Sequence, residues 1–425
     1  MTSPQTIRAS VAAGAVCAVL ALPGALSAGE GFYRVAREPD GRWWCRTPWN
    51  ARFVPLAVDH VNGWGFVGAD DEFPYRRHVA AHYPSVEAWG AETLARLKAW
   101  GFNLLGANSD PAIRYRGELP YTVFIGFGRA FAGRGGDCAI PCAGGGRFPN
   151  VFHPDFPAAA RRIAREFCRA NVGNATLFGY FLDNELPWKG AGDRATGLFD
   201  AVDALAATNS AKRALTAYLA GREATDEAKA GFLAVAAERY FAETAAAIRA
   251  VDPGHLVLGA RFAGWEGAHE AVWRAAGRHC DVVSVNLYPH VNLADGTVTE
   301  WNGRRHVPYR QVLDPLQACA SRPVMVTEWS FPALDAGLPC TRGGGQRVPT
   351  QADRARASEV CARALLATPY VVGYSFFMWM DQPSDAPGEN CNYGLVNLRG
   401  VPYRELTDMF ARLQANPCAL RGCER

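Results

Sequence analysis

Eight apolar runs along the chain predict buried β-strands. Most of these runs are continuously apolar rather than alternating with polar positions, which is typical of parallel strands covered on both faces. Segments with helical periodicity separate the runs; in residues 85–100, for example, Leu94, Leu97 and Trp100 fall on one helical face. The predicted strands cover residues 53–58, 102–106, 121–127, 177–182, 255–260, 281–286, 324–327 and 371–377.

This alternation predicts an α/β fold, namely a (β/α)8 TIM barrel in one domain. Residues 32–46 predict a short N-terminal β-hairpin with its turn at residues 39–41. A doubly wound open sheet is the rival fold, but it normally carries a glycine-rich phosphate loop after its first strand. Residues 59–64 read Asp-His-Val-Asn-Gly-Trp and are not such a loop, so the barrel is favoured. The predicted helical segments are residues 85–100, 153–171, 190–251, 268–278, 309–320, 351–367 and 406–414.

The composition narrows the class of partner. Of 425 residues, 49% are hydrophobic and 20% are charged, which is a globular composition. The formal net charge is only +3 and no basic run stands out. Neither nucleic acid nor an anionic membrane is therefore an expected partner.

The first residues predict export. Arg8 precedes an apolar stretch at residues 11–21, and small residues follow up to Ala28. This pattern is typical of a secretory signal peptide, here residues 1–28, which leaves residues 29–425 as the mature domain. We therefore expect a secreted or periplasmic protein with no stable membrane insertion after cleavage. An N-terminal segment that is kept as an anchor is the alternative.

The chain contains 12 cysteines, and export permits disulfides. None of the cysteine spacings fits a zinc site, so no metal is expected. The cysteines in or beside helical patterns are expected as buried thiols. Sequence position leaves three pairings open: Cys138 with Cys142, Cys418 with Cys423, and Cys340 with Cys391.

Two predicted strands end in glutamate. Residues 177–182 form an apolar run that stops at Asp183, Asn184 and Glu185, and residues 324–327 are followed by Glu328. Carboxylates at buried strand ends are costly unless paired, and they mark candidate sites of chemistry. The carboxyl ends of barrel strands converge on one mouth. Two carboxylates that flank one bond are what glycoside hydrolysis requires.

Other polar and aromatic residues also end predicted strands. We expect Trp379 to stack on a sugar ring and Asn184 to bind the hydroxyl next to the reacting carbon. Asp183 is expected to give structural support, by pairing with Arg261 or by capping a loop. For each aromatic residue the alternative is a place in the core. The further candidates for substrate contact are His60, Asn108, Trp188, Arg261, Trp265, Tyr288 and Trp329.

An ordered set of segments resembles a known family. Asn184-Glu185 after the fourth strand and a Glu after the seventh resemble the pattern of glycoside hydrolase clan A, and more narrowly the chain is similar to the family 50 β-agarases. The resemblance runs from about residue 32 to the C-terminus. The segments that carry it are residues 96–103, 179–188, 252–256, 259–262, 281–288, 327–328, 333–335 and 394–402.

The resemblance implies a retaining β-glycosidase that acts by double displacement. Glu185 matches the acid/base of the family and Glu328 matches its nucleophile. The resemblance implies no metal and no organic cofactor, and it implies cleavage of β-1,4 bonds of agar. The family usually carries an additional N-terminal β-sandwich, which we do not expect in this chain.

The predicted function is thus hydrolysis of a β-linked polysaccharide or oligosaccharide, with the two carboxyl groups roughly 5–5.5 Å apart. Three alternatives remain open at this level. They are a non-catalytic carbohydrate-binding barrel, a clan A hydrolase of another β-glycan, and a barrel enzyme of unrelated chemistry.

Overall fold

The computed structural model describes residues 31–190, 196–264, 268–302 and 304–422. The predicted signal segment at residues 1–28, Trp265 and Cys423 lie outside these residues. Within the described ranges, no helix combines the length and apolar character needed to cross a membrane.

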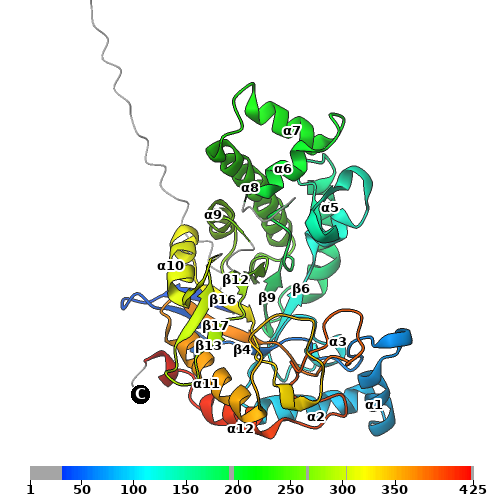
Figure 1. Cartoon of the computed structure of the whole chain (residues 1–425), viewed down its shortest axis with the longest axis vertical. Helices are drawn as coiled ribbons and strands as arrows, with labels where there is room; N and C mark the ends of the chain where they lie inside the picture. The colour runs from blue at the N-terminus through cyan, green and yellow to red at the C-terminus, as the bar shows by residue number, and fades with distance from the viewer. Residues whose placement is uncertain (1–30, 191–195, 265–267, 303, 423–425) are drawn as a thin grey trace, which may run out of the picture.

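A curled sheet of nine parallel strands organises the molecule (Figure 1). Its order is β10-β9-β6-β5-β4-β17-β16-β12-β11, so strands that follow one another in sequence are mostly neighbours in space. The parallel, buried strands confirm the predicted α/β class. The strands are β4 (Leu56–Val58), β5 (Leu104–Leu105), β6 (Tyr121–Phe124), β9 (Leu177–Phe181), β10 (Leu256–Val257), β11 (Phe262–Ala263), β12 (Val283–Asn286), β16 (Val324–Glu328) and β17 (Val371–Phe376).

The two ends of this sheet are consecutive parts of one chain segment. Strand β10 pairs with β9, and β11, which begins five residues after β10 ends, pairs with β12. Between them, the amide of Leu182 donates to the carbonyl of Gly259 at 2.8 Å. On the other side, the amide of Asp281 donates to the carbonyl of Val257 at 2.9 Å. Segment 256–263 therefore contacts both neighbouring strands.

A small antiparallel sheet at the N-terminus covers one end of the interior of the curled sheet. Strands β1 (Arg34–Arg37) and β2 (Trp43–Arg46) form the predicted hairpin, and β3 (Arg52–Phe53) extends it. Tyr33 and Cys45 are buried there. They pack in one cluster with side chains that come from or adjoin seven strands of the large sheet: Ala57, Leu104, Phe178, Leu256, Val282, Met325 and Val372.

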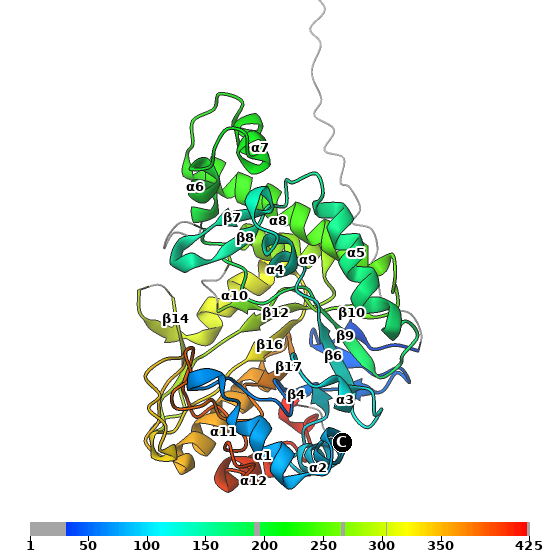
Figure 2. The ribbon, with the colours of Figure 1, turned by 90° about the vertical axis from the view of Figure 1, so that its right-hand side faces the viewer.

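Helices connect and surround the strands (Figures 1 and 2). Helices α6, α7 and α8 form a lobe at one end of the molecule, within the alanine-rich section that follows Glu185. The helices are α1 (Pro74–His82), α2 (Val86–Ala99), α3 (Pro111–Arg114), α4 (Phe127–Ala132), α5 (Phe156–Cys168), α6 (Gly197–Asp203), α7 (Ser210–Leu219), α8 (Asp226–Arg249), α9 (Glu270–His279), α10 (Tyr309–Ala320), α11 (Gln351–Ala367) and α12 (Arg404–Leu413).

Two small antiparallel units were not predicted. Strands β7 (Ala139–Pro141) and β8 (Arg147–Pro149) form a hairpin in the glycine-rich segment after β6. Strands β13 (His290–Val291), β14 (Val298–Trp301) and β15 (His306–Pro308) form a three-stranded sheet after β12. Their strands are only two to four residues long, which is too short to leave a clear periodicity.

One predicted disulfide is present. Cys340 and Cys391 are bonded and join the loop after β16 to the loop after β17. Cys138 and Cys142 are not bonded to each other. The third proposed pairing includes Cys423, which lies outside the described residues.

Candidate active site

Four strand ends of the large sheet turn in the same unusual way. The residue after, or shortly after, the strand has a positive φ, although it is not glycine. This left-handed conformation is uncommon for such residues and tends to gather at functional sites, where the surrounding structure compensates its cost. The residues and φ values are His60 after β4 (55°), Asn108 after β5 (58°), Glu185 after β9 (50°) and Arg261 after β10 (46°).

Glu328 is the last residue of β16 and is only 8% exposed. One carboxylate oxygen accepts a hydrogen bond from Arg261 Nη2 at 2.5 Å, and the other accepts one from the Tyr288 hydroxyl at 2.9 Å. Burial raises the pKa of Glu328 to about 7; the nearby Glu185 and Asp59 act in the same direction, while Arg261 opposes them. Glu328 therefore changes between its protonated and ionised forms close to neutral pH.

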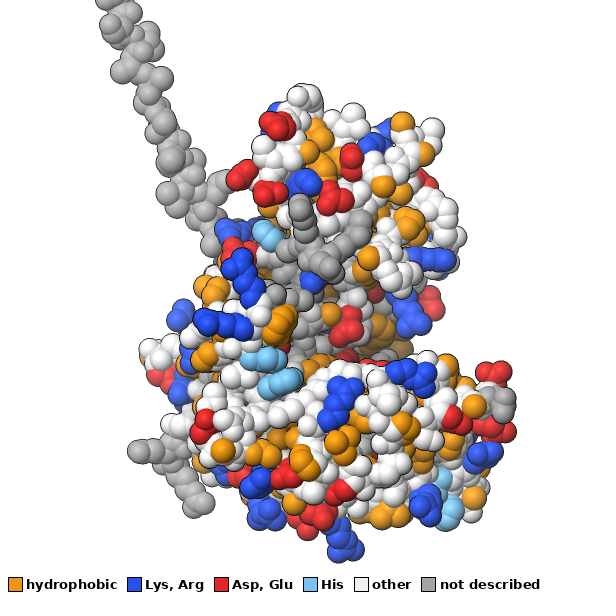
Figure 3. Space-filling model, in the orientation of Figure 1, with side chains coloured by type: hydrophobic (Ala, Val, Ile, Leu, Met, Phe, Trp, Pro, Cys, Tyr) orange, Lys and Arg blue, Asp and Glu red, His pale blue; other side chains and the backbone are white. Residues whose placement is uncertain are grey.

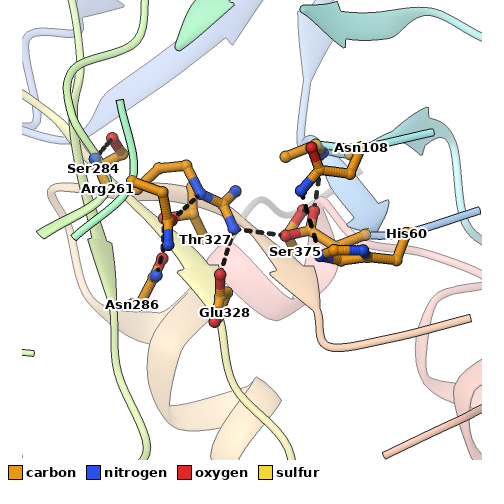
Figure 4. Close-up of polar contacts among 12 residues, drawn as sticks. His60, Asn108, Arg261, Ser284, Asn286, Thr327, Glu328 and Ser375 are labelled. Carbon is orange, nitrogen blue, oxygen red and sulfur yellow. Dashed lines mark hydrogen bonds and ion pairs between the residues drawn. The ribbon is translucent and has the colours of Figure 1, made fainter. Parts of the chain in front are cut away.

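Arg261 connects three strand ends (Figure 4). Besides Glu328, its Nη2 donates to Asp59 Oδ2 at 2.7 Å, and its Nε donates to Asn184 Oδ1 at 2.7 Å. The guanidinium is 1% exposed and Nη1 has no hydrogen-bond partner among the described residues. Asp59 does not reach Glu328 directly, so Arg261 is the positive group between these two carboxylates.

Asp59 is fully buried at the end of β4. Besides Arg261, it accepts hydrogen bonds from the Ser375 hydroxyl at 2.7 Å and from the Ala107 amide at 3.0 Å. A side chain at Gly106 would collide with Asp59 Oδ1, so the absence of a Cβ at Gly106 makes room for this carboxylate. Asp59 thereby fixes the direction of the guanidinium.

Glu185 is exposed, in contrast to Glu328. Its Oε1 accepts a hydrogen bond from Asn286 Nδ2 at 2.8 Å, and its amide donates to the carbonyl of Arg261 at 3.0 Å. Asn286 is itself held by Thr327, whose hydroxyl donates to Asn286 Oδ1 at 2.8 Å (Figure 4). Since Thr327 directly precedes Glu328, this chain of contacts ties the two glutamates to one rim.

His60 and Asn108 lie beside each other on the rim. His60 Nε2 and Asn108 Nδ2 are 3.2 Å apart, and the His60 ring packs between Phe66 and Phe377 at centroid distances of 5.3 and 5.5 Å. Burial lowers the pKa of His60 to about 4; Asp59 opposes this and Arg261 adds to it. At neutral pH His60 is therefore an uncharged hydrogen-bonding group.

The tryptophans predicted as substrate contacts lie in the core. Trp188, Trp329 and Trp379 are each at most 1% exposed. The Trp379 indole donates to the Tyr75 hydroxyl at 2.8 Å and its ring stacks on Trp100 at 5.9 Å. Because Trp379 is buried, the structure does not support the expected stacking of a sugar on its ring. These three tryptophans lie in the core, which was the alternative for each of them. Trp265 lies outside the described residues.

Asp183 has the structural role that was predicted, as a cap. Its carboxylate accepts hydrogen bonds from the amides of Gly128 and Arg129, at 2.6 and 3.1 Å, at the start of α4. The Tyr240 hydroxyl donates to the same carboxylate at 2.6 Å. The other expectation, a pair with Arg261, is not found because Arg261 turns toward Asn184, Asp59 and Glu328.

Sequence reasoning missed several members of the cluster. Asp59 and Asn286 each end or follow a predicted strand, so the criterion that selected Glu185 could have selected them too. Ser375 and Thr327 lie within strands and Phe377 is one of several apolar residues at the end of β17. No sequence signal distinguishes those three from core residues.

One face of the molecule is hollowed. In the space-filling view, a hollow separates the lobe with α6, α7 and α8 from the rest of the molecule, and acidic side chains lie in it (Figure 3). Positive and negative side chains are otherwise interspersed on this face (Figure 3). A paired-carboxylate site with neutral amide, imidazole and phenol groups around it suits a polar, uncharged substrate.

The chain is similar in sequence to curated β-agarases, and its fold is similar to that of solved structures. No protein-family model matches the chain. The chain is 28% identical over 380 residues to "Beta-agarase A" of Vibrio sp. (strain JT0107), which is 79% of this chain and 36% of that protein. It is 24% identical over 400 residues to "Beta-agarase B" of the same organism, with 84% and 39% covered. The chain thus spans less than half the length of these two relatives.

Solved structures with the same fold include the crystal structure of BpGH50, with a TM-score of 0.76 and 21% identity over 94% of this chain and 85% of that chain. A structure described as an exo-beta-agarase gives a TM-score of 0.75 and 20% identity, with 92% and 66% covered. At these identities the likeness concerns the fold.

Proposed function

We propose that the protein is a retaining β-glycoside hydrolase of agar-like β-galactans. The observation that carries the proposal is the pair of unlike carboxyl groups at one rim. Glu185 is exposed, whereas Glu328 is buried between Arg261 and Tyr288. Homology to β-agarases supports a β-linked glycan as substrate.

We also propose that the curled sheet is a (β/α)8 barrel of the clan A type. Segment 256–263 would be its fifth strand, because it contacts β9 on one side and β12 on the other. In such a barrel the strand ends with Glu185 and Glu328 face one mouth. The catalytic domain would comprise residues 29–425, after cleavage of a signal peptide at residues 1–28, and the enzyme would be secreted or periplasmic.

In the proposed reaction the ionised Glu328 attacks the anomeric carbon and forms a covalent glycosyl-enzyme. At the same time Glu185 donates its proton to the leaving glycosidic oxygen. Glu185, now ionised, takes a proton from water, which attacks the anomeric carbon and releases Glu328. The product keeps the β configuration, and no cofactor takes part.

The surrounding residues have distinct parts in this scheme. Arg261 and Tyr288 hold the two oxygens of Glu328 and stabilise its negative charge. Asn286 orients Glu185 through Oε1. Asn184, His60 and Asn108 supply neutral donors and acceptors for sugar hydroxyls at the same rim.

The test is to incubate the purified protein with agarose, other galactans, β-glucans and mannans, and to analyse the products by chromatography and by NMR of the new anomeric centre. We expect oligosaccharides from agarose or a related galactan, first released as the β anomer. Glu328→Ala should abolish turnover, and azide should restore turnover of an activated glycoside by Glu185→Ala.

Full activity in both variants would rule out the assignment. Binding of intact oligosaccharide without any product would instead favour the non-catalytic carbohydrate-binding alternative. Release of the α anomer would replace retention by inversion, for which the two carboxyl groups would be roughly 6.5–9.5 Å apart.

A further inference from the structure

Aromatic rings form a continuous row that starts at Glu328 and leads away from it. The row begins with Tyr288, whose hydroxyl donates to Glu328. The rings come from three different loops at the carboxyl ends of strands, so the row exists only in the folded chain. Its successive ring-centroid distances are 6.3 Å from Tyr288 to Phe377, 5.5 Å from Phe377 to His60, and 5.3 Å from His60 to Phe66.

Trp64 lies at the surface in the same loop as His60 and Phe66. It precedes Phe66 by two residues and is 42% exposed, whereas most other tryptophans in the described part of the chain are buried. Trp64 lines a cavity of about 570 Å³, which is within the usual size range of small-molecule sites. The polar side chains around the cavity belong to Arg76, Tyr83, Ser85 and Asp110.

The loop that carries Trp64 is fixed to the active-site rim. Asn62 Oδ1 accepts a hydrogen bond from the amide of Gly65 at 2.8 Å, and Asn62 Nδ2 lies 3.3 and 3.4 Å from the carbonyls of His60 and Asn108. Trp64 follows His60 by four residues, so it lies at most about 14 Å from His60 along the chain. The loop that carries Trp64 is therefore held beside His60 and Asn108.

The chemistry of this cavity matches a sugar. An exposed indole face suits the apolar C–H face of a pyranose ring, and charged or hydroxyl side chains at the border suit its hydroxyl groups. Asp110 is held in place because its Oδ1 accepts the amide of Ala112 as the cap of α3. Arg76 is exposed on α1. Asp110 offers hydrogen-bond acceptors and Arg76 offers donors, and together their charges cancel.

We infer that the Trp64 cavity is a distal binding site for sugar units of the same polysaccharide chain whose scissile bond lies between Glu185 and Glu328. This inference rests on the proposed function and specifies its substrate: a chain long enough to reach from the two glutamates to the Trp64 cavity, rather than a disaccharide. The packed rings from Tyr288 to Phe66 connect Glu328 with the loop that carries Trp64.

The test compares Trp64→Ala with the wild type on agarose oligosaccharides of increasing length and on a short activated aryl β-galactoside. Trp49→Ala is the matched control, because Trp49 is 81% exposed in the turn between β2 and β3, outside the rim. We expect Trp64→Ala to lower kcat/KM roughly tenfold on long oligosaccharides, mainly through KM. Turnover of the aryl glycoside should stay unchanged, and Trp49→Ala should match the wild type throughout.

Binding of the same oligosaccharides to the inactive Glu328→Gln protein, with and without Trp64→Ala, gives a second measurement. Affinity should rise with chain length only when Trp64 is present. The distal site is refuted if the enzyme cleaves agarose but Trp64→Ala does not change how kcat/KM and affinity depend on oligosaccharide length. In that case the proposed function stands. If the wild type cleaves none of these substrates, the proposed function fails, and the distal site fails with it.

Discussion

At the scale of single residues, Arg261 determines the electrostatics of the site. It is the positive group in contact with both Asp59 and Glu328, two buried carboxylates. Without its charge, the repulsion from Asp59 and Glu185 would act on Glu328 unopposed. Glu328 must be ionised to attack, so the acid side of the pH profile of kcat/KM should report its pKa.

We predict that the wild-type kcat/KM falls as the pH is lowered through about 7, the pKa of Glu328. Arg261→Met removes the positive charge that favours ionised Glu328, so the pKa of Glu328 rises. The acid side of the pH profile of kcat/KM then moves to higher pH, and below the new pKa kcat/KM falls roughly tenfold per pH unit. Arg261→Lys keeps the charge and should leave the limb nearer to its original position. Identical pH profiles for Arg261→Met and the wild type would contradict this electrostatic role.

A second residue-scale prediction concerns Asn286, which donates to Glu185 Oε1. Asn286→Ala removes a hydrogen bond that orients Glu185. Since a typical hydrogen bond contributes about 0.5–1.5 kcal/mol, we expect kcat to fall roughly tenfold in steady-state kinetics as the proton donor loses its orientation. Asn292→Ala, in the turn between β13 and β14, serves as the control. Equal kcat values for both variants would exclude Asn286 from the positioning of Glu185.

At the scale of elements, the ends of the strands matter more than their middles. The residues at the end of β9 divide their tasks, because Asp183 caps α4 while Asn184 and Glu185 face the rim. Two helix predictions are confirmed to the residue, at 309–320 and 351–367. Helical periodicity and capping are local properties, so a single sequence carries them. The pairing of β7 with β8 and of β13 with β14 and β15 depends on contacts that periodicity does not reveal.

Removal of the α4 cap should weaken the fold without direct damage to the two glutamates. Asp183→Ala leaves two amides and the Tyr240 hydroxyl without their acceptor in a buried environment, which should cost about 2–4 kcal/mol of unfolding free energy. Denaturant unfolding measures the loss. Asp408→Ala, at an exposed position of α12, should change stability by less than about 0.5 kcal/mol. A loss no larger in Asp183→Ala would exclude the cap as a source of stability.

At the scale of the whole molecule, two further parts of the chain pack on the curled sheet: the N-terminal sheet and the loops joined by the disulfide between Cys340 and Cys391. The N-terminal sheet closes one end of its interior with Tyr33 and Cys45. At the rim, the disulfide between Cys340 and Cys391 secures the loop that packs on Tyr288; a methyl group at Gly345 would lie 3.2 Å from the Tyr288 ring. The loop secured by the disulfide therefore influences the position of Glu328, because it packs on Tyr288 and Tyr288 donates to Glu328.

Loss of this disulfide should affect both stability and substrate binding. It closes a loop with a sequence separation of 51 residues, for which chain entropy predicts roughly 4 kcal/mol as an upper range. We expect Cys340→Ser/Cys391→Ser to lower Tm by several degrees and to raise KM, since the loop on Tyr288 loosens. Cys319→Ser, which alters a thiol that is not in a disulfide, should change neither quantity. Unaltered thermal unfolding in the double variant would refute the prediction.

By itself the sequence determined the α/β class, the exact bounds of α10 and α11, and the glutamates at two strand ends. These follow from hydrophobic periodicity and from the high cost of burying a carboxylate, both of which are visible residue by residue. Only the tertiary structure decided that Asp59 and Asn286 join the cluster, that Trp379 lies in the core, and that Arg261 turns toward Glu328. Each of these depends on which residues from distant strands meet, and the direction of a side chain at a strand end is set by such neighbours rather than by its own segment.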